Sequence, residues 1–166
     1  MLGFKNADFG VKDALDALQV ALATYPEIDS KRVYVAGHSS AATLALQIAS
    51  GADQFRACAA YAPITDVAAR LKDSLGNFDQ LVPGFSEALR RASPNNRVAA
   101  IRCPVFLFHA SDDGNVLPES VRTFRDALVA QGKTVNYVLA KSGGHYQSMI
   151  REGIPRAIGW FRELPG

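Results

Sequence analysis

Gly37-His38-Ser39-Ser40-Ala41 lies between an apolar segment at residues 32–36 and a helix-forming segment at residues 42–50. A strand, a tight Gly-x-Ser-x-small turn and a helix in this order form a nucleophile elbow, which lifts one serine out of the backbone. The amino end of the helix carries positive partial charge and points at that serine, where an oxyanion would form. Ala41 replaces the glycine that usually closes this turn. The alternative interpretation is an ordinary strand-to-helix turn in which a serine caps the helix.

The composition is that of an ordinary globular protein. The 166 residues are 48% apolar and 20% charged, and the net charge of +2 is too small to predict a nucleic-acid or membrane partner. The chain has neither the apolar core of a secretory signal nor a run of roughly 18 apolar residues that would span a membrane. We therefore expect a cytoplasmic location, unless truncation has removed a signal. Cys58 and Cys103 lie in apolar surroundings and predict buried free thiols rather than a disulfide or a metal site.

Apolar periodicity and turn residues predict strands that alternate with helices. Helices are expected at residues 11–24, 42–50, 66–75, 86–92, 118–131 and 147–164, and strands at residues 32–36, 56–62, 105–110 and 135–140. Gly76 should end the third helix, and Pro155 should bend or offset the last one. This order predicts an α/β fold, a three-layer sandwich around a mostly parallel sheet of about four strands. We expect residues 1–166 to form a single domain, in which residues 64–102 are either a cap over a site or a connecting excursion.

A carboxylate and a histidine follow the two later strands. A serine hydroxyl becomes a useful nucleophile when a base takes its proton, and the base is usually a histidine that a carboxylate orients. Such groups gather at the carboxyl ends of parallel strands. Asp112 and Asp113 follow the strand at 105–110, and His145 follows the strand at 135–140. Each segment alone resembles an ordinary turn, but the order Ser, Asp, His across three strand ends favours a catalytic triad.

The other two histidines fit catalysis less well. His38 lies inside the elbow, where a packing role is expected. His109 ends a strand, where a hydrogen-bonded structural role is expected.

Three motifs resemble the α/β-hydrolase fold, and within it the prolyl oligopeptidase and dienelactone hydrolase branches. They are the elbow at residues 37–41, the segment His109-Ala110-Ser111-Asp112-Asp113-Gly114-Asn115-Val116, and Gly143-Gly144-His145. Residues 93–104 also resemble the stretch that leads into the acid-bearing strand of the peptidase branch. The resemblance extends over most of the chain, from about residue 8 to residue 161.

The resemblance implies a role for each site residue. Ser39 would be the nucleophile and His145 the general base and acid. Asp113 is preferred to Asp112 as the orienting carboxylate, because in this family the acid comes four residues after the strand-end histidine, here His109. The backbone amide of Ser40 would be one donor to the oxyanion.

The chain also departs from the family's pattern. Only 38 residues precede Ser39, so we expect the family's first four strands to have no counterpart in this sequence. We expect the loop that supplies the second oxyanion donor to be missing with them, and losing one such donor typically costs about 10²–10³ in rate. The strand at 32–36 would then have an open edge, which invites pairing with another copy. We therefore expect either a fragment of a larger hydrolase or a shortened homologue that forms a homo-oligomer through this edge.

These observations predict a serine hydrolase that cleaves carboxylic esters, or peptide and amide bonds, through an acyl-enzyme intermediate. Esters are favoured because an alkoxide leaves more readily than an amine. The expected partner is a small ester or a short peptide, and no cofactor or metal is implied. The alternative is a non-catalytic hydrolase-like module that serves in assembly or binding. Thiol chemistry is disfavoured because Cys58 and Cys103 lie outside the elbow.

Overall fold

Four parallel strands form the centre of the molecule. The computed structural model describes residues 8–165, with the side chains of all of them except Phe9 and residues 74–77. The strands are β1 (Tyr34–His38), β2 (Ala57–Tyr61), β3 (Val105–Ala110) and β4 (Val135–Ala140), and they lie in the sheet in that order. Each pairs with its neighbour in parallel register. The predicted α/β fold with a parallel four-stranded sheet is confirmed.

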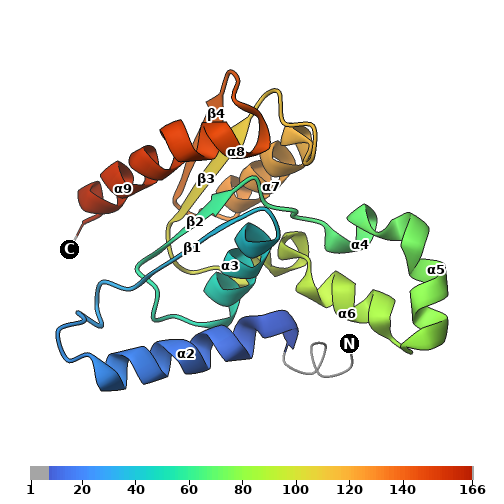
Figure 1. The fold of residues 1–166 in the computed structure, drawn as a ribbon, viewed down its shortest axis with the longest axis horizontal. Coiled ribbons are helices and arrows are strands. Elements are labelled where there is room, and N and C mark those ends of the chain that lie inside the picture. The colour runs from blue at the N-terminus through green and yellow to red at the C-terminus, as the bar shows by residue number, and fades with distance from the viewer. Residues whose placement is uncertain (1–7, 166) are drawn as a thin grey trace.

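Helices cover both faces of this sheet (Figure 1). One face carries α3 (Ser40–Gly51) and α7 (Pro118–Ala130), and α2 (Val11–Thr24), which follows a short 3-10 turn, η1 (Asp8–Gly10), packs against α3. Its core includes Leu46, Leu107 and Phe124, all fully buried. The other face carries α8 (Gly144–Ser148), the π-helical turn η3 (Met149–Gly153) and α9 (Ile154–Glu163), which pack on Phe106 and Phe108. None of the helices in the described part of the chain has the length and apolarity of a membrane span.

Residues 64–102 leave the sheet and return to it as three helices and a turn. These are α4 (Val67–Arg70), α5 (Lys72–Leu81), α6 (Phe85–Ala92) and the 3-10 segment η2 (Pro94–Ala100). Figure 1 shows α4, α5 and α6 projecting to one side of the sheet. The predicted C-terminal end of the helix at 66–75 is wrong. Helical geometry breaks at Leu71, and a second helix then continues to Leu81. Gly76 does not stop it, and the helix ends before Pro83-Gly84, where Gly84 has φ 75°.

The last helical segment begins three residues earlier than predicted. It starts at Gly144, so that His145 lies in the first turn of α8 rather than in a loop. The predicted offset near Pro155 occurs as the π turn, in which the amide of Ile154 donates to the carbonyl of Met149. Pro155 has no amide hydrogen to donate, and the wider turn that precedes it lets the helix continue.

Candidate active site

The elbow serine has a strained backbone. β1 extends to His38, two residues beyond the predicted end, so that Ser39 follows the strand directly. Ser39 has φ 57° and ψ −120°, a conformation that residues with side chains rarely adopt, and its amide donates to the carbonyl of Tyr61 at 2.9 Å. A Cβ atom on Gly37 would lie 2.1 Å from the carbonyl oxygen of Ala41. The turn therefore requires glycine at position 37.

The amino end of α3 presents a backbone donor beside Ser39. The amides of Ala42 and Thr43 donate to the carbonyl of Ser39 at 3.0 and 3.1 Å. The amide of Ser40 comes first in the helix, where backbone amides have no acceptor within the helix itself. Together with the positive end of the helix dipole, this amide can stabilise a negative oxygen near Ser39.

Asp113 and His145 are brought together by the ends of β3 and β4. Nδ1 of His145 donates to Oδ2 of Asp113 at 2.8 Å. The other oxygen, Oδ1, accepts from the amides of Asn115 at 2.8 Å and Val116 at 3.1 Å. Burial by itself would raise the pKa of Asp113, but the hydrogen bonds from His145 and the two amides hold this pKa below its usual value. Since the carboxylate accepts the proton on Nδ1, Nε2 of the neutral His145 ring carries the free lone pair.

Asp112 contacts a different part of the same loop. Its two carboxylate oxygens accept from the amides of Gly143 at 3.0 Å and Gly144 at 2.9 Å, and these bonds lower its pKa. Gly143 has φ 113°, and a Cβ atom there would lie 2.9 Å from the amide nitrogen of Ser148. Asp112 therefore holds the turn that carries His145, a role that its position after a strand does not reveal.

His38 connects the elbow to the segment that carries His145. Its Nε2 donates to the backbone carbonyl of His145 at 2.7 Å, and the two imidazole rings lie 4.4 Å apart between centroids. Burial lowers the pKa of His38. The structure thus places the residue before Ser39 directly against His145. Within the part of the chain that the structure describes, the hydroxyl of Ser39 makes no hydrogen bond.

Two apolar hollows lie beside the elbow and the Asp113 loop. The first has a volume of about 150 Å³, and its lining combines α3 with the excursion at Ser40, Thr43, Leu44, Gln47, Ile64, Val67, Leu89 and Ala92. The second, of about 250 Å³, shares Ile64 and reaches Asn115 and Val116 beside the Asp113 carboxylate. Neither hollow could be predicted from sequence patterns, because each is assembled from segments that are far apart in the chain.

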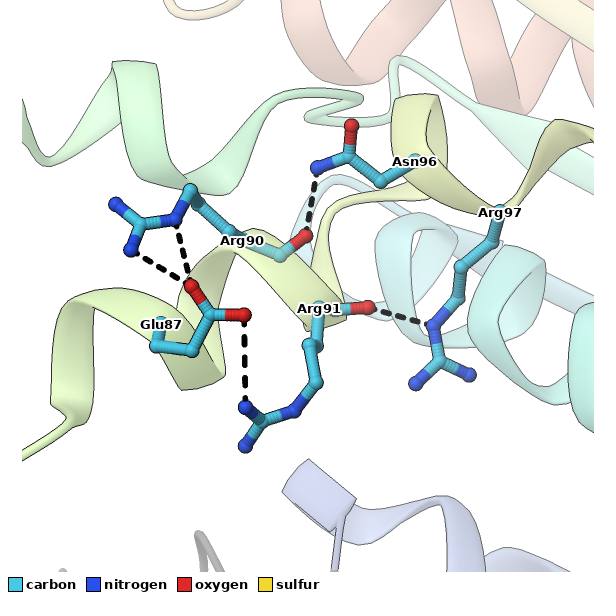
Figure 2. Close-up of a pocket in the computed structure, with 5 residues that line it drawn as sticks. All are labelled: Glu87, Arg90, Arg91, Asn96 and Arg97. Carbon is cyan, nitrogen blue, oxygen red and sulfur yellow. Dashed lines mark hydrogen bonds and ion pairs between the residues drawn. The ribbon is translucent and has the colours of Figure 1, made fainter.

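A third hollow, of about 420 Å³, lies over α6 and η2 (Figure 2). Its charged groups are largely paired with one another. The carboxylate of Glu87 accepts from Arg90 at 2.7 Å and lies 3.7 Å from Arg91, while Arg97 donates to the carbonyl of Arg91. Ion pairs as exposed as these contribute little to the stability of the fold. The lining of this hollow does not include Ser39, Asp113 or His145. We assign no chemistry to it.

The two cysteines are free, with Cys58 buried and Cys103 half-buried. Burial raises the pKa of both thiols, that of Cys103 to about 11. Across the described residues, no cluster of three histidine, cysteine, aspartate or glutamate side chains could hold a metal ion.

A strained serine between a parallel strand and a helix, with an Asp–His pair at two later strand ends, defines the class as the α/β-hydrolase fold. The chain belongs to the prolyl oligopeptidase family, whose model matches residues 2–164. No curated protein sequence matches it.

Solved structures with the same fold are much longer than this chain. An acylaminoacyl peptidase from Pyrococcus horikoshii matches with a TM-score of 0.77 and 22% identity, over 92% of this chain and 27% of that one. A Mycobacterium tuberculosis puromycin-hydrolyzing peptidase matches with a TM-score of 0.81 and 22% identity, over 93% and 25%. A Pyrococcus furiosus esterase matches with a TM-score of 0.68 and 22% identity, over 92% and 60%. The chain thus spans about a quarter of the two peptidases.

Proposed function

We propose that this chain is a serine hydrolase that works by acyl transfer, with Ser39 as nucleophile, His145 as general base and acid, and Asp113 as the orienting carboxylate. The observation that carries the proposal is the strained backbone of Ser39. The preceding residue, His38, is hydrogen-bonded to the backbone of His145, whose side chain is hydrogen-bonded to Asp113. A non-glycine residue in such a conformation costs on the order of 1–3 kcal/mol and persists where the surrounding structure enforces it. Strain of this kind clusters at functional sites.

In the proposed reaction, Nε2 of His145 takes the hydroxyl proton of Ser39 as Oγ bonds to the acyl carbon. The carbonyl electron pair moves onto the oxygen, where the amide of Ser40 and the α3 dipole stabilise it. When the tetrahedral intermediate collapses, the bond to the leaving group breaks and that group takes the proton from Nε2. Water then attacks the acyl-enzyme with the same proton transfers and releases the acid. Asp113 keeps Nδ1 protonated and stabilises the imidazolium throughout.

The proposed substrates are carboxylic esters with a small apolar group. Among the described residues, the amide of Ser40 at the start of α3 is placed to act as an oxyanion donor, and one such donor typically contributes about 10²–10³ in rate. An ester depends less on oxyanion stabilisation than an amide does, because an alkoxide is a better leaving group than an amine. The 150 Å³ hollow beside Ser40 is apolar and can hold a group about the size of benzene.

Short peptides are the second candidate class, and the family favours them. Among the solved structures, one acylaminoacyl peptidase is in complex with Z-Gly-Gly-Phe-chloromethyl ketone and one puromycin hydrolase mutant with PGG. Parallel assays with p-nitrophenyl esters and with aminoacyl p-nitroanilides of matched acyl groups distinguish the two classes. Faster turnover of the ester supports esters as the substrate class, and faster turnover of the anilide supports peptides instead.

A fluorophosphonate probe tests the proposed nucleophile directly. We expect the folded chain to be labelled once, and Ser39→Ala and His145→Ala to lose the label. Ser50→Ala, at the far end of the same helix, is the matched control and should be labelled at the wild-type rate. Asp113→Asn should be labelled about 10³–10⁴ times more slowly, because an amide no longer enforces the required histidine tautomer. A wild-type chain that is folded by circular dichroism and unlabelled would instead support the non-catalytic module.

A further inference from the structure

His109 is a buried titratable residue that the proposed mechanism does not use. It lies next to the end of β3, on the sheet face of Val105 and Leu107, and is fully buried. Its Nε2 atom lies 2.9 Å from the carbonyl oxygen of Val116 and 3.2 Å from Oδ2 of Asp113. Both neighbours are acceptors, so the proton of the neutral ring is on Nε2.

The other ring nitrogen of His109 has no partner. Nδ1 is buried and makes no hydrogen bond within the described part of the chain. With the proton on Nε2, this atom is an acceptor whose desolvation is uncompensated, which costs stability. An apolar side chain of similar volume would avoid that cost. The contribution of histidine at this position is therefore the N–H group that it directs at Val116 and Asp113.

This N–H group closes a ring of contacts around the Asp113 carboxylate. His109 donates to the carbonyl of Val116, and the amide of Val116 donates back to Oδ1 of Asp113 at 3.1 Å. Oδ2 lies between Nε2 of His109 at 3.2 Å and Nδ1 of His145 at 2.8 Å. His109 thus fixes the turn at Val116, whose amide binds Oδ1 of Asp113, and it places the positive end of its N–H dipole beside Oδ2.

We propose that His109 is a positioning residue for the carboxylate of Asp113 and, through it, sets how strongly His145 holds a proton. This inference rests on the proposed function for its kinetic consequences. Without the His109 dipole, Oδ2 has fewer positive neighbours and becomes a stronger acceptor for His145. The imidazolium of His145 is then stabilised, and the ring titrates at higher pH. The turn at Val116 also loses its anchor, so the base is less well aligned for proton transfer.

The titratable groups around His109 are few, which makes the effect separable. Asp113, on the loop after β3, and His145, on α8, both interact with its ring. Asp112 interacts with Asp113, and His38 contacts His145, so these two groups reach His109 only through an intervening residue.

The experiment compares His109→Leu with His109→Gln. In glutamine the amide nitrogen is as many bonds from Cβ as Nε2 is in histidine, so it can donate to the same acceptors, whereas leucine cannot. We expect His109→Leu to lower kcat for a p-nitrophenyl ester on the order of tenfold with KM unchanged. The acid limb of its pH–rate profile should move to higher pH, and His109→Gln should restore both properties. Leu107→Ala, on the same strand and face, is the control for a general loss of stability and should leave the profile in place.

A second measurement keeps the inference independent of turnover. The ¹⁵N shifts of the His145 ring, followed by NMR against pH, should give a higher titration midpoint in His109→Leu than in the wild type and a wild-type midpoint in His109→Gln. An unchanged midpoint in folded His109→Leu overturns the role of His109, whether or not the chain is active. Absent turnover in the wild type, with the NMR shift present, overturns the proposed function and leaves the positioning of Asp113 by His109 standing.

Discussion

Gly37 is the residue on which the geometry of the elbow depends. Its missing Cβ leaves room for the carbonyl of Ala41, which would otherwise be 2.1 Å away, and for the amide of Ala42 at 2.7 Å. These neighbours are backbone atoms and cannot rotate aside. The tight return of the chain, and with it the exposure of Ser39 at the strand end, therefore requires glycine at this position.

Gly37→Ala should destabilise the protein by about 3 kcal/mol and abolish labelling by the fluorophosphonate probe, because the turn must open to admit the methyl group. The matched control is Gly51→Ala at the end of α3, where the nearest atom to the new Cβ is a Val11 methyl at 3.9 Å. Urea denaturation checks both variants. A Gly37→Ala protein with wild-type stability and labelling would show that the turn is less constrained than its geometry indicates.

Two histidines with lowered pKa values give this protein a predictable response to acid. Burial lowers the pKa of both His38 and His109. In the unfolded chain a histidine titrates at about 6.5, so below that pH the unfolded state binds protons that the folded state resists. The free energy of unfolding should therefore fall as the pH drops from about 7.5 through 6.5, before aspartates and glutamates begin to titrate.

Urea denaturation at a series of pH values measures this slope. His109→Gln should reduce it, because one of the two histidines with a lowered pKa is gone, while Leu107→Ala should lower stability at every pH without changing the slope. An identical slope in His109→Gln and the wild type would mean that His109 takes up its proton equally well in the folded state.

At the scale of elements, sequence patterns predicted most of the fold for a clear physical reason. β3 is wholly buried and α7 has a regular apolar face, so hydrophobic periodicity defines both with little ambiguity. The elbow motif singled out Ser39, and the rule that catalytic groups follow strand ends pointed to His145 and to the Asp112–Asp113 pair. The resemblance to the family then favoured Asp113. The structure brings Asp113 and His145 into contact and sets His38 against His145.

What escaped prediction depends on contacts between distant segments. The break between α4 and α5 at Leu71 and the π turn before Pro155 are two examples. Where helix propensity is weak, tertiary packing determines the local backbone geometry. The role of Asp112 in holding the turn at Gly143 was missed because an aspartate after a strand has the same local pattern whether it orients a base or caps a loop.

The π turn places Gly153 against the sheet. A Cβ atom there would lie 3.0 Å from ring carbons of both Phe108 and Tyr61, which are themselves buried. We expect Gly153→Ala to push η3 away from the sheet, to destabilise the protein by about 1–3 kcal/mol and to slow probe labelling, since α8 and His145 continue into this turn.

Gly159→Ala is the control within the same helical segment. Apart from the neighbouring backbone of α9 itself, no heavy atom of the described residues lies within 4 Å of a Cβ at that position, so the exchange should stabilise α9 by up to about 1 kcal/mol and leave labelling unchanged. Thermal unfolding and labelling rates check the pair. Equal behaviour of the two variants would show that the close approach at Gly153 is not what keeps His145 in place.

At the scale of the whole molecule, the open side of β1 stands out. β1 is the outermost strand of the sheet, paired with β2 alone among the described strands. On η3 and α9, Ile150, Ile154 and Ile158 recur every four residues and are 53%, 38% and 46% exposed. Ile154 and Ile158 line an apolar groove with Ala36 and Gly37 of β1 and with Phe161. An unpaired strand edge beside an apolar stripe is typical of an interface.

We propose that a second copy of the chain covers this edge, with the two β1 strands adjacent across a twofold axis. Such an interface is self-complementary, so the same edge and stripe meet in both copies, and a net charge of +2 opposes association only weakly.

Sedimentation equilibrium should therefore give a dimer for the wild type. Ala36→Lys and Ile158→Lys should each give a monomer, because a lysine there charges the edge or the groove. Val129→Lys, at an equally exposed apolar residue on α7, should remain dimeric. A wild-type monomer that reacts with the probe at full rate would overturn the proposal, since the edge would then need no partner for the elbow to function.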